Sequence, residues 1–345
     1  MRTMKLTGIR EMEMFDVPDP LLINESDVLI KIKSLGICGS DIHYYTSGRI
    51  GSQVVSYPFT VGHECSGIVE RVGKSASKIK PGDRVAIDPA MPCGECDQCL
   101  SGRPHTCRKL KFLGCPGQAE GALTDYLIMP ESSCYTVPAD LDYEKAALIE
   151  PLSIGVYAVR QSIPMKGAKV GILGFGPIGM SVMLAAMAEG AAKVFVTDKI
   201  DARLAIARKC GAYSVTNVNH ENEIQQITRD EPLLLDVIFE CCGQQEAFDN
   251  AFHLLKPGGK LMLVGIPEFD RWSFSVDLGR RKEINIQHVR RQNDCVEDAI
   301  EMVSSGKIDI SDMPTHRFKL DDSKKAFDMV AGYRDGVMKA MIEFE

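Results

Sequence analysis

Residues 169–198 read KVGILGFGPIGMSVMLAAMAEGAAKVFVTD. The segment opens as a short apolar strand, continues through a glycine turn into an Ala- and Met-rich helix, and closes as a second strand. The turn fits G-x-G-x-x-G and runs Gly174-Phe175-Gly176-Pro177-Ile178-Gly179. Between a strand and a helix, the three glycines permit a tight turn, close backbone approach to a pyrophosphate, and close packing of helix on strand. The segment therefore predicts a dinucleotide-binding βαβ unit, against the alternative of a glycine turn with no ligand.

The choice of dinucleotide depends on Asp198, which ends the second strand. An acid here accepts hydrogen bonds from the ribose hydroxyls and repels a 2′-phosphate, which favours NAD over NADP. Lys199 and Arg203 soften this preference, because a nearby cation accommodates a phosphate. The helix N-terminus offers its N–H groups to the phosphates. Val264 and Ile266, at the end of a later strand, are further candidates for cofactor contact.

The same alternation continues beyond Asp198. It gives a helix at 201–211, a strand near Val215, the strand LLLDVIFE at 233–240, a helix at 244–259 and the strand KLMLVGI at 260–266. Repeated βαβ units predict a doubly wound parallel sheet with helices on both faces. The uncharged run 170–188 approaches the length of a membrane span, but four glycines and a proline favour a buried strand, turn and helix.

The first 150 residues have a different texture. Short β-branched runs, such as DVLIKIKSLG at 27–36 and DRVAIDP at 83–89, alternate with Gly, Pro and Asp. This spacing predicts an antiparallel, barrel-like β-domain. We expect an α/β protein of two domains: a β-rich domain over 1–154, completed by 289–345, and an inserted dinucleotide-binding domain over 155–288.

Composition excludes several classes of protein. A net charge of −7 over 345 residues argues against nucleic acid or an anionic membrane as the main partner. The first twenty residues carry charges where a signal peptide needs an apolar core, so we expect a cytoplasmic protein. In that reducing compartment the twelve cysteines should remain thiols unless a metal binds them.

Four of those cysteines lie in CGECDQCLSGRPHTC, residues 93–107. Short turns between Cys93, Cys96, Cys99 and Cys107 let their thiolates converge on one tetrahedral ion. Four sulfurs fill the coordination shell of zinc and leave no place for substrate, so we predict a structural zinc. An iron–sulfur cluster or a redox role is the alternative.

A second group of metal-ligand types lies in Cys38-Gly39-Ser40-Asp41-Ile42-His43 and Gly62-His63-Glu64. Neither segment is convincing alone, because a lone Cys is usually a core residue and a lone His often has only a structural partner. A dinucleotide domain in the same chain favours the interpretation of these segments as a metal site, because a Lewis acid prepares an alcohol for loss of hydride.

The segments GICGSDIHYY (36–45), VGHECSGIVERVG (61–73), the four-cysteine loop, ALIEPLSIG (147–155) and 169–198 together resemble the zinc-dependent medium-chain alcohol dehydrogenases. Within that family they are similar to the sorbitol and xylitol (polyol) dehydrogenases, in the same order over nearly the whole chain. The resemblance implies a GroES-like catalytic domain beside a Rossmann domain, with two zinc ions and NAD. It also implies a homo-tetramer or homodimer.

The resemblance assigns roles by position. Cys38 and His63 would bind the catalytic zinc with Glu64 as third ligand, directly or in an alternative state, and Glu150 would sit beside the metal. Asp41 would orient His63, while Ser40 and His43 would carry the alcohol proton to solvent. Substrate contacts would come from Tyr44, Phe112, Glu150, Arg291 and Gln292.

Two departures from the animal sorbitol dehydrogenases leave the substrate open. Gln292 stands where they have a tyrosine after the arginine, and the four-cysteine loop, which they have lost, is present. We therefore expect oxidation of a secondary alcohol of a sorbitol-, xylitol- or L-iditol-type polyol to a ketose. The alternatives are a sibling enzyme acting on threonine, 2,3-butanediol or a sugar acid, a quinone or enoyl reductase without catalytic zinc, and a zinc module that binds nucleic acid.

Overall fold

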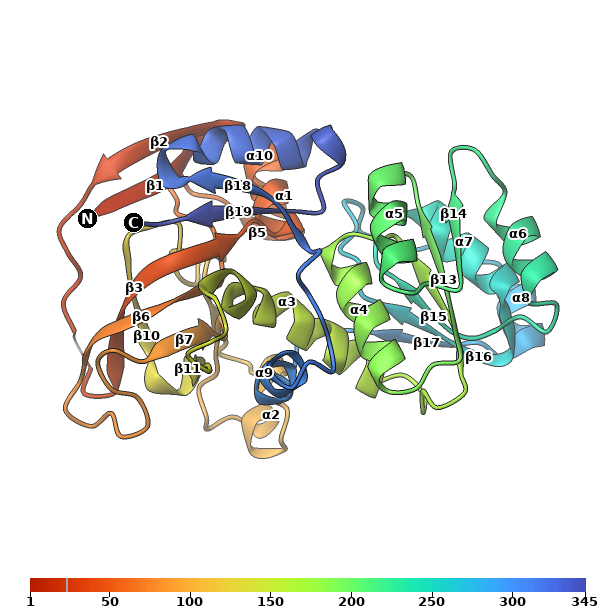
Figure 1. Cartoon of the computed structure of the whole chain (residues 1–345), viewed down its shortest axis with the longest axis horizontal. Coiled ribbons are helices and arrows are strands. Elements are labelled where there is room, and N and C mark those ends of the chain that lie inside the picture. Colours follow the sequence, from red (N-terminus) through yellow and green to blue (C-terminus); the bar gives the residue numbers. More distant parts are fainter. Residues whose placement is uncertain (23) are drawn as a thin grey trace. The chain divides into compact units, whose positions relative to one another are not determined.

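The computed structural model describes residues 1–22 and 24–345, and the chain forms two compact units (Figure 1). Unit 1 comprises Met1–Glu150, Val296–Ser305 and Met313–Glu345, and unit 2 comprises Pro151–Cys295 and Gly306–Asp312. The expected boundaries lie after residues 154 and 288, whereas the compact units divide after Glu150 and after Cys295. Residues Gly306–Asp312, expected in the first domain, belong to unit 2. Helix α3 (Tyr143–Arg160) contains the first boundary, with Pro151 inside it.

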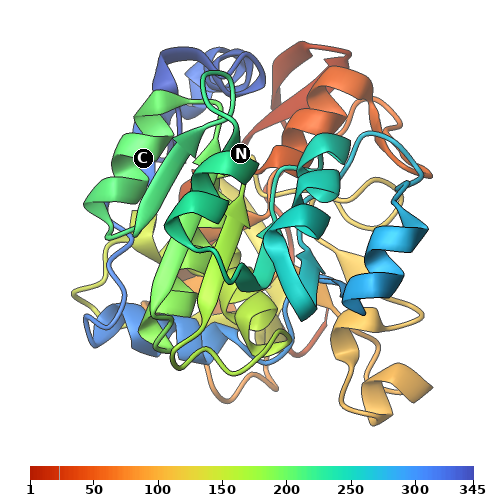
Figure 2. The ribbon, with the colours of Figure 1, turned by 90° about the vertical axis from the view of Figure 1, so that its right-hand side faces the viewer.

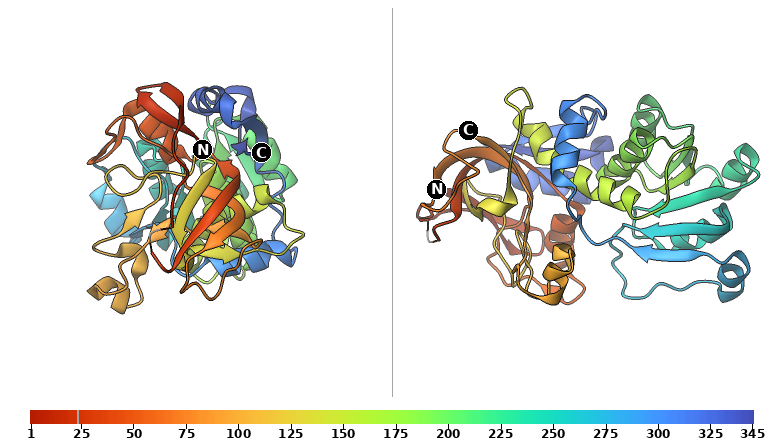
Figure 3. Two further views of the ribbon diagram at one scale, coloured as in Figure 1. Left: turned by 90° about the vertical axis from the view of Figure 1, so that its left-hand side faces the viewer. Right: turned by 90° about the horizontal axis from the view of Figure 1, so that it is seen from below.

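Unit 1 is built on a largely antiparallel sheet with β3 at its centre. One edge of β3 pairs with β6, and its other edge pairs with β10 near its start and with β19 near its end. The left panel of Figure 3 shows β3, β6 and β10 side by side. The order is β11 (Cys134–Thr136), β7 (Arg84–Ile87), β6 (Glu64–Val72), β3 (Asp27–Gly36), β19 (Lys339–Glu343) and β18 (Pro314–Lys319), with β10 (Tyr126–Pro130) also on β3.

Three two-stranded sheets and several helices complete unit 1. The pairs are β1 (Arg2–Gly8) with β2 (Glu11–Asp16), β4 (Arg49–Ile50) with β5 (Gln53–Val54), and β8 (Ala90–Met91) with β9 (Lys111–Phe112). The helices are α1 (Gly39–Ser47), α2 (Asp97–Leu100), α9 (Val296–Ser304), α10 (Ser323–Ala331) and the first part of α3. One apolar core joins β3, α1 and α10, with Ile30, Ile32, Tyr45 and Phe327 fully buried. Burial on this scale stabilises the unit, because each large apolar side chain contributes about 1.5–3 kcal/mol.

Unit 2 contains a six-stranded sheet whose strands all run parallel. The order is β14 (Ser214–Asn217), β13 (Lys193–Asp198), β12 (Lys169–Leu173), β15 (Leu235–Glu240), β16 (Leu255–Leu263) and β17 (Asn285–His288). This is the doubly wound order 3-2-1-4-5-6, which reverses between β12 and β15. Dinucleotides bind outside the carboxyl ends of the strands at such a reversal, so the ends of β12 and β15 mark the cofactor site.

Helices cover this sheet, as Figure 2 and the right panel of Figure 3 show. They are α4 (Pro177–Ala188), α5 (Asp201–Lys209), α6 (Glu223–Asp230), α7 (Gln245–Leu254) and α8 (Val276–Lys282). The strands β12, β13 and β15 are buried along nearly their whole length. Strands covered on both faces need continuous apolar runs, which explains KVGIL and KVFVT in the sequence.

The uncharged run 170–188 forms β12, the glycine turn and α4, as the sequence predicted. Among the described residues, no helix has both the length and the apolar character needed to span a bilayer.

Candidate metal and dinucleotide sites

The first group of metal-ligand types begins at the turn between β3 and α1. Cys38 occupies the position before the first residue of α1, and Asp41 lies in the first turn of that helix. The Asp41 carboxylate accepts a hydrogen bond from the Cys38 backbone N–H at 3.1 Å. A carboxylate in the first turn satisfies an otherwise orphaned N–H and complements the helix dipole. The local sequence CGSD therefore fixes the direction of the Cys38 side chain.

Asp41 also reaches the second segment. Its Oδ1 accepts the Gly62 N–H at 3.1 Å and lies 3.4 Å from Nδ1 of His63. Asp41 is fully buried and His63 is nearly so. One carboxylate thus joins the Cys38 turn to the His63 segment and holds the imidazole by one nitrogen, which leaves the other nitrogen for a metal.

Ligand atoms of Cys38, His63 and Glu64 lie within 4.8 Å of one another. Thiolate, imidazole and carboxylate are ligand types that zinc accepts, and three protein ligands are typical of catalytic zinc sites. Burial lowers the pKa of His63, but Asp41 and Cys38 outweigh it, so this pKa lies well above its usual value. The surroundings thus favour positive charge at this position, which suits a cation.

Glu64 is held by a second buried charge. Lys339 Nζ lies 2.7 and 2.5 Å from the two carboxylate oxygens of Glu64 and donates to the Ile37 carbonyl at 3.1 Å. Glu64 opens β6, Lys339 opens β19, and Gly36 ends β3 between them. A Cβ on Gly36 would overlap Oε2 of Glu64, so a side chain at this position would force the Glu64 carboxylate to move.

Glu150 is a third carboxyl group near these residues, after Asp41 and Glu64. It is 6 % exposed and lies on α3, just before Pro151. Burial raises the pKa of Glu150 to about 8; the charge of His63 opposes the rise, and Glu64 and Asp88 add to it. A carboxyl held near neutrality beside a thiol and an imidazole is able to bind a proton or a cation.

The other predicted residues of this unit lie on α1 and β9. Ser40 and His43 are half-buried in the first two turns of α1. The Phe112 ring lies 5.3 Å, centroid to centroid, from that of His63. The Tyr44 hydroxyl donates to Gln53 at 3.2 Å and lies 3.8 Å from the Cys115 sulfur, so internal contacts engage it.

The four-cysteine lobe carries α2 and forms the second group of metal-ligand types. Sulfur atoms of Cys93, Cys96, Cys99 and Cys107 approach one another at 3.5–3.8 Å. Hydrogen bonds from the backbone of Arg108 and then of Cys99 lower the pKa of Cys96 to about 6, and the backbone of Cys93 lowers that of Cys107. N–H donors that stabilise the thiolates of Cys96 and Cys107 suit a thiolate metal site, although burial raises the pKa of Cys99 to about 12.

In unit 2, the glycine turn has the geometry that its sequence predicts. Gly174 has φ +94°, and a Cβ there would lie 2.6 Å from Cβ of Cys242. A Cβ on Gly179 would overlap the Gly174 carbonyl oxygen, so the helix packs directly on the turn. Gly176 caps α4, and Pro177 begins it. Backbone N–H groups at the start of α4 are therefore free of side-chain obstruction, as a pyrophosphate needs.

Asp198 and Arg203 lie beside this turn. Asp198 accepts hydrogen bonds from the Phe175 N–H at 2.6 Å and from the Ile200 N–H at 2.9 Å. A Cβ on Gly176 would lie 3.5 Å from Nη1 of Arg203, so the guanidinium flanks the second glycine. The acidic side chain of Asp198 and the cationic side chain of Arg203 thus both lie near the end of β13, the second strand of the βαβ unit.

Two buried charged residues of these sites carry no motif and were not predicted. Lys339 lies in the C-terminal strand β19, and Glu240 ends β15. Glu240 accepts the N–H groups of Cys242 and Gly243 at 2.8 and 2.6 Å, and its backbone carbonyl accepts from Val264 and Gly265. The segment FECCG could have indicated Glu240, because a buried carboxylate at the end of an apolar strand beside the glycine turn needs hydrogen-bond donors nearby.

The remaining predicted residues lie at the ends of β16 and β17. Val264 is half-buried beside Glu240, and Ile266 is exposed. Arg291 has φ +55°, and the Gln292 side-chain carbonyl accepts the Cys295 N–H at 3.0 Å. Gln292 therefore serves the local turn in this structure. Both residues belong to unit 2, whereas the group around Cys38 belongs to unit 1.

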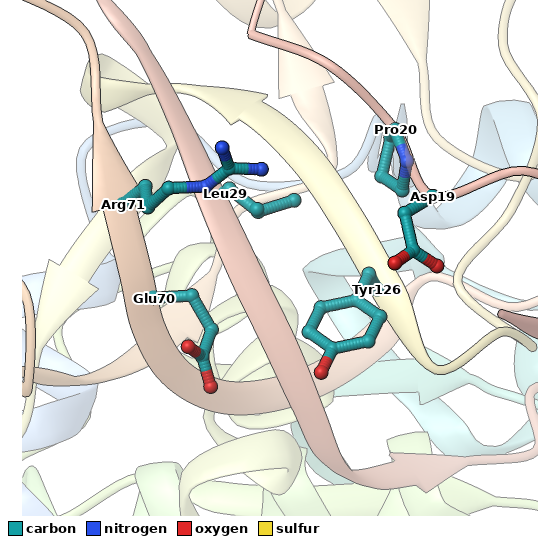
Figure 4. A pocket seen from close by; sticks show the side chains of 6 residues that line it. All are labelled: Asp19, Pro20, Leu29, Glu70, Arg71 and Tyr126. Atoms are coloured by element: carbon teal, nitrogen blue, oxygen red, sulfur yellow. The ribbon is translucent and has the colours of Figure 1, made fainter.

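A surface pocket in unit 1 lies apart from these groups (Figure 4). Its lining combines β3, β6 and β10 with the segment before β3, and consists of Asp19, Pro20, Leu29, Glu70, Arg71 and Tyr126. No predicted site residue lines it.

Comparison with known proteins identifies the family. Residues 24–139 match the alcohol dehydrogenase GroES-like domain, and residues 177–305 match the zinc-binding dehydrogenase model. The chain is 37 % identical to sorbitol dehydrogenase of Bacillus subtilis over 335 residues, which cover 96 % of this chain and 93 % of that protein. The chain is a zinc-binding dehydrogenase.

Two further proteins are similar to this chain over most of their length. L-idonate 5-dehydrogenase of Vitis vinifera is 35 % identical, over 88 % of this chain and 85 % of that protein. The crystal structure of an Escherichia coli oxidoreductase of unknown specificity superposes with a TM-score of 0.94 at 33 % identity, covering 100 % of this chain and 99 % of that one.

This zinc-binding dehydrogenase is thus an oxidoreductase of the polyol and sugar dehydrogenase group, with zinc and a nicotinamide dinucleotide as cofactors. The predicted fold class is confirmed, with a GroES-like domain and a Rossmann domain.

Proposed function

We propose that this dehydrogenase oxidises a secondary hydroxyl of a sorbitol-, xylitol- or L-iditol-type polyol to the corresponding ketose, with NAD as the acceptor. The observation that carries the proposal is the meeting of Cys38, His63 and Glu64 ligand atoms within 4.8 Å, with Asp41 fully buried behind them. The similarity to sorbitol dehydrogenase supports the substrate class.

In this proposal Cys38, His63 and Glu64 hold the catalytic zinc, and Glu150 borders it. When bound, zinc supplies a Lewis acid that stabilises negative charge on the substrate oxygen and so lowers the pKa of the alcohol. Asp41 keeps the His63 ring in one orientation through Nδ1. The four-cysteine lobe holds a second, structural zinc, because four thiolates complete a tetrahedral shell.

The reaction removes one proton and one hydride from the alcohol. The hydroxyl proton leaves through Ser40 and His43, which lie in helix α1, two and five positions after Cys38. NAD⁺, held by the glycine turn and the start of α4, would supply the acceptor for the hydride of the substrate carbon, so that the overall products would be NADH, a ketone and a proton. Phe112, beside the His63 ring, provides an apolar wall that limits water near the reacting carbon.

NAD is proposed as the cofactor because Asp198 lies at the end of β13, where a 2′-phosphate would meet its charge. The glycine turn and the start of α4 bind the pyrophosphate. Val264 and Ile266 line the cofactor site in this proposal, and Arg203 flanks the adenosine part. We further propose a cytoplasmic homo-oligomer, either a dimer or a tetramer.

The second candidate is a sugar-acid dehydrogenase, which the similarity to L-idonate 5-dehydrogenase favours. Tyr44, Phe112, Glu150, Arg291 and Gln292 are the proposed substrate contacts. An arginine suits a substrate carboxylate as well as a hydroxyl, because its guanidinium pairs with both.

The test is NADH formation with a panel of sorbitol, xylitol, L-iditol, L-idonate, threonine and 2,3-butanediol, using wild-type enzyme, Cys38→Ser and Cys210→Ser. We expect a polyol to give the highest kcat/KM, with loss of turnover but retained NAD binding in Cys38→Ser. Cys210→Ser, at the end of α5, is the matched control with normal rates. Normal polyol oxidation by Cys38→Ser would contradict the metal mechanism, and L-idonate as the preferred substrate would select the second candidate.

A further inference from the structure

Glu240, the last residue of β15, is a fully buried acidic residue of unit 2. Its Oε1 accepts hydrogen bonds from the N–H groups of Cys242 and Gly243 at 2.8 and 2.6 Å. Among the described residues, its Oε2 has no hydrogen-bond partner. Burial of the carboxyl group raises the pKa of Glu240. Because a buried oxygen without a partner costs free energy, this residue calls for an explanation beyond the stability of the fold.

Glu240 connects the two loops that follow β15 and β16. Its side chain holds the backbone of residues 242–243, in the loop after β15. Its backbone carbonyl accepts the N–H groups of Val264 and Gly265, in the loop after β16, at 2.9 Å each. One residue therefore fixes the start of both loops.

Two glycines bring these loops into direct contact. A Cβ on Gly265 would lie 2.7 Å from Oε2 of Glu240 and would overlap the backbone nitrogen of Gly243. Gly243 has φ +67°, and a Cβ there would lie 2.6 Å from the carbonyl oxygen of Ile266. The loops thus touch backbone to backbone, and Oε2 of Glu240 packs where a side chain of residue 265 would stand.

Both loops lie on one side of the reversal in strand order. A doubly wound sheet consists of two mononucleotide-binding halves, and a dinucleotide binds across the crevice between them. Asp198 ends β13 in one half, and the proposed function assigns it to the adenosine ribose. The nicotinamide nucleotide then belongs to the half formed by β15, β16 and β17. Cys242 borders both halves, because a Cβ on Gly174 would lie 2.6 Å from its Cβ.

We propose that Glu240 is a positioning residue that fixes the two loops against which the nicotinamide nucleotide binds. Glu240 is fully buried, so it acts through the backbone of Cys242, Gly243 and Gly265 and not by touching the cofactor. Oε1 orients the first loop by accepting its N–H groups, and Oε2 sets the distance to the second loop. This inference rests on the proposed function, which places NAD at the glycine turn.

A merely structural Glu240 predicts a different result on mutation. If the residue only stabilised unit 2, its loss would lower the melting temperature and would change the affinities for both halves of the cofactor equally, or not at all. If it positions the nicotinamide half, its loss weakens NAD⁺ binding and spares binding of AMP, which carries the adenosine half alone. The ratio of the two affinities therefore separates the two roles.

The experiment measures the dissociation constants of NAD⁺ and AMP by titration calorimetry on the full-length protein. Glu240→Leu, which removes both oxygens, should bind NAD⁺ about tenfold more weakly and AMP within about twofold of the wild type. Glu240→Gln keeps an acceptor and the size of the side chain, so both constants should stay close to those of the wild type. Glu223→Leu is the control, since it removes another buried carboxylate of unit 2, which accepts from Asn250 at 2.6 Å, and should change neither constant.

Gly265→Ala gives an independent test that keeps the carboxylate, and it carries the inference if Glu240→Leu does not fold. Its methyl group meets Oε2 of Glu240 and the Gly243 nitrogen, so the loops must separate, and NAD⁺ binding should weaken while AMP binding persists. Unchanged NAD⁺ affinity in Gly265→Ala, equal losses of NAD⁺ and AMP affinity in Glu240→Leu, or the same selective loss in Glu223→Leu would overturn the inference. Glu240→Gln as weak as Glu240→Leu would also overturn it. A wild type that does not bind NAD⁺ would instead refute the proposed function.

Discussion

Replacing Asp41 with asparagine tests how the metal-ligand group is held together. Three potential donors face the Asp41 carboxylate: the Cys38 N–H at 3.1 Å, the Gly62 N–H at 3.1 Å and Nδ1 of His63 at 3.4 Å. Asparagine keeps one acceptor oxygen, which can face Gly62 and His63, but it turns an amide donor toward the Cys38 N–H. One buried N–H then lacks a partner, at a cost of about 1–3 kcal/mol.

The expected results are a lower melting temperature and weaker zinc binding. Loss of a residue that orients a metal-binding histidine typically lowers metal affinity by about 10- to 100-fold. The assays are thermal unfolding with and without chelator and competition for Zn²⁺, with Cys38→Ser defining the signal of this site. Asp27→Asn is a control for the loss of a buried carboxylate elsewhere in unit 1, since Asp27, at the start of β3, accepts a hydrogen bond from the Asn24 N–H. An Asp41→Asn enzyme with wild-type zinc affinity would refute the orienting role of Asp41.

Three further predictions address the other parts of the molecule. Gly174→Ala should weaken NAD binding by at least tenfold, measured by fluorescence titration, because φ +94° and the approach of Cys242 exclude a Cβ; unchanged affinity would contradict this account of the turn. Cys96→Ser should lose one zinc per chain and expose residues 93–107 to protease while substrate preference persists, and altered preference with an unchanged melting curve would argue against a structural lobe. Dialysis against a strong chelator should abolish turnover and leave NAD binding intact, with activity restored by Zn²⁺; full activity at zero metal content would refute metal dependence.

The dinucleotide domain was predictable because its information is local. The glycines, the flanking apolar strands and Asp198 all fall within thirty residues, and each has a conformational task that only its residue type performs. The four-cysteine lobe is equally local, since the spacing of its sulfurs sets their convergence. In both cases one short segment of chain contains all the residues on which the prediction depends.

Lys339 escaped prediction because its role depends on pairing across strands. Some 275 positions separate it from Glu64, and only the order β6, β3, β19 brings them together. The sequence VMKAM reads as an apolar strand with one charged residue, which is normally exposed. Gly36 is also informative, because a side chain there would overlap Glu64. This becomes apparent only when the strands on both sides of β3 are known.

Gln292 illustrates a different limit. The resemblance assigns a substrate contact to its side chain, and the structure adds that the side-chain oxygen accepts the Cys295 N–H. The substrate contact stays a prediction. A polar side chain in a turn competes for nearby backbone groups, and sequence position alone does not say which partner wins.

In the proposed NAD complex, Asp198 would serve both the ribose and the scaffold, since its carboxylate accepts hydrogen bonds from the Phe175 and Ile200 N–H groups. A redesign of this enzyme to accept NADP would therefore face a conflict. Deleting the carboxylate would remove its repulsion of the 2′-phosphate, but it would also remove the hydrogen bonds that hold the turn proposed to bind the pyrophosphate. Asparagine, which keeps an acceptor without the charge, is the more promising starting point than glycine or alanine.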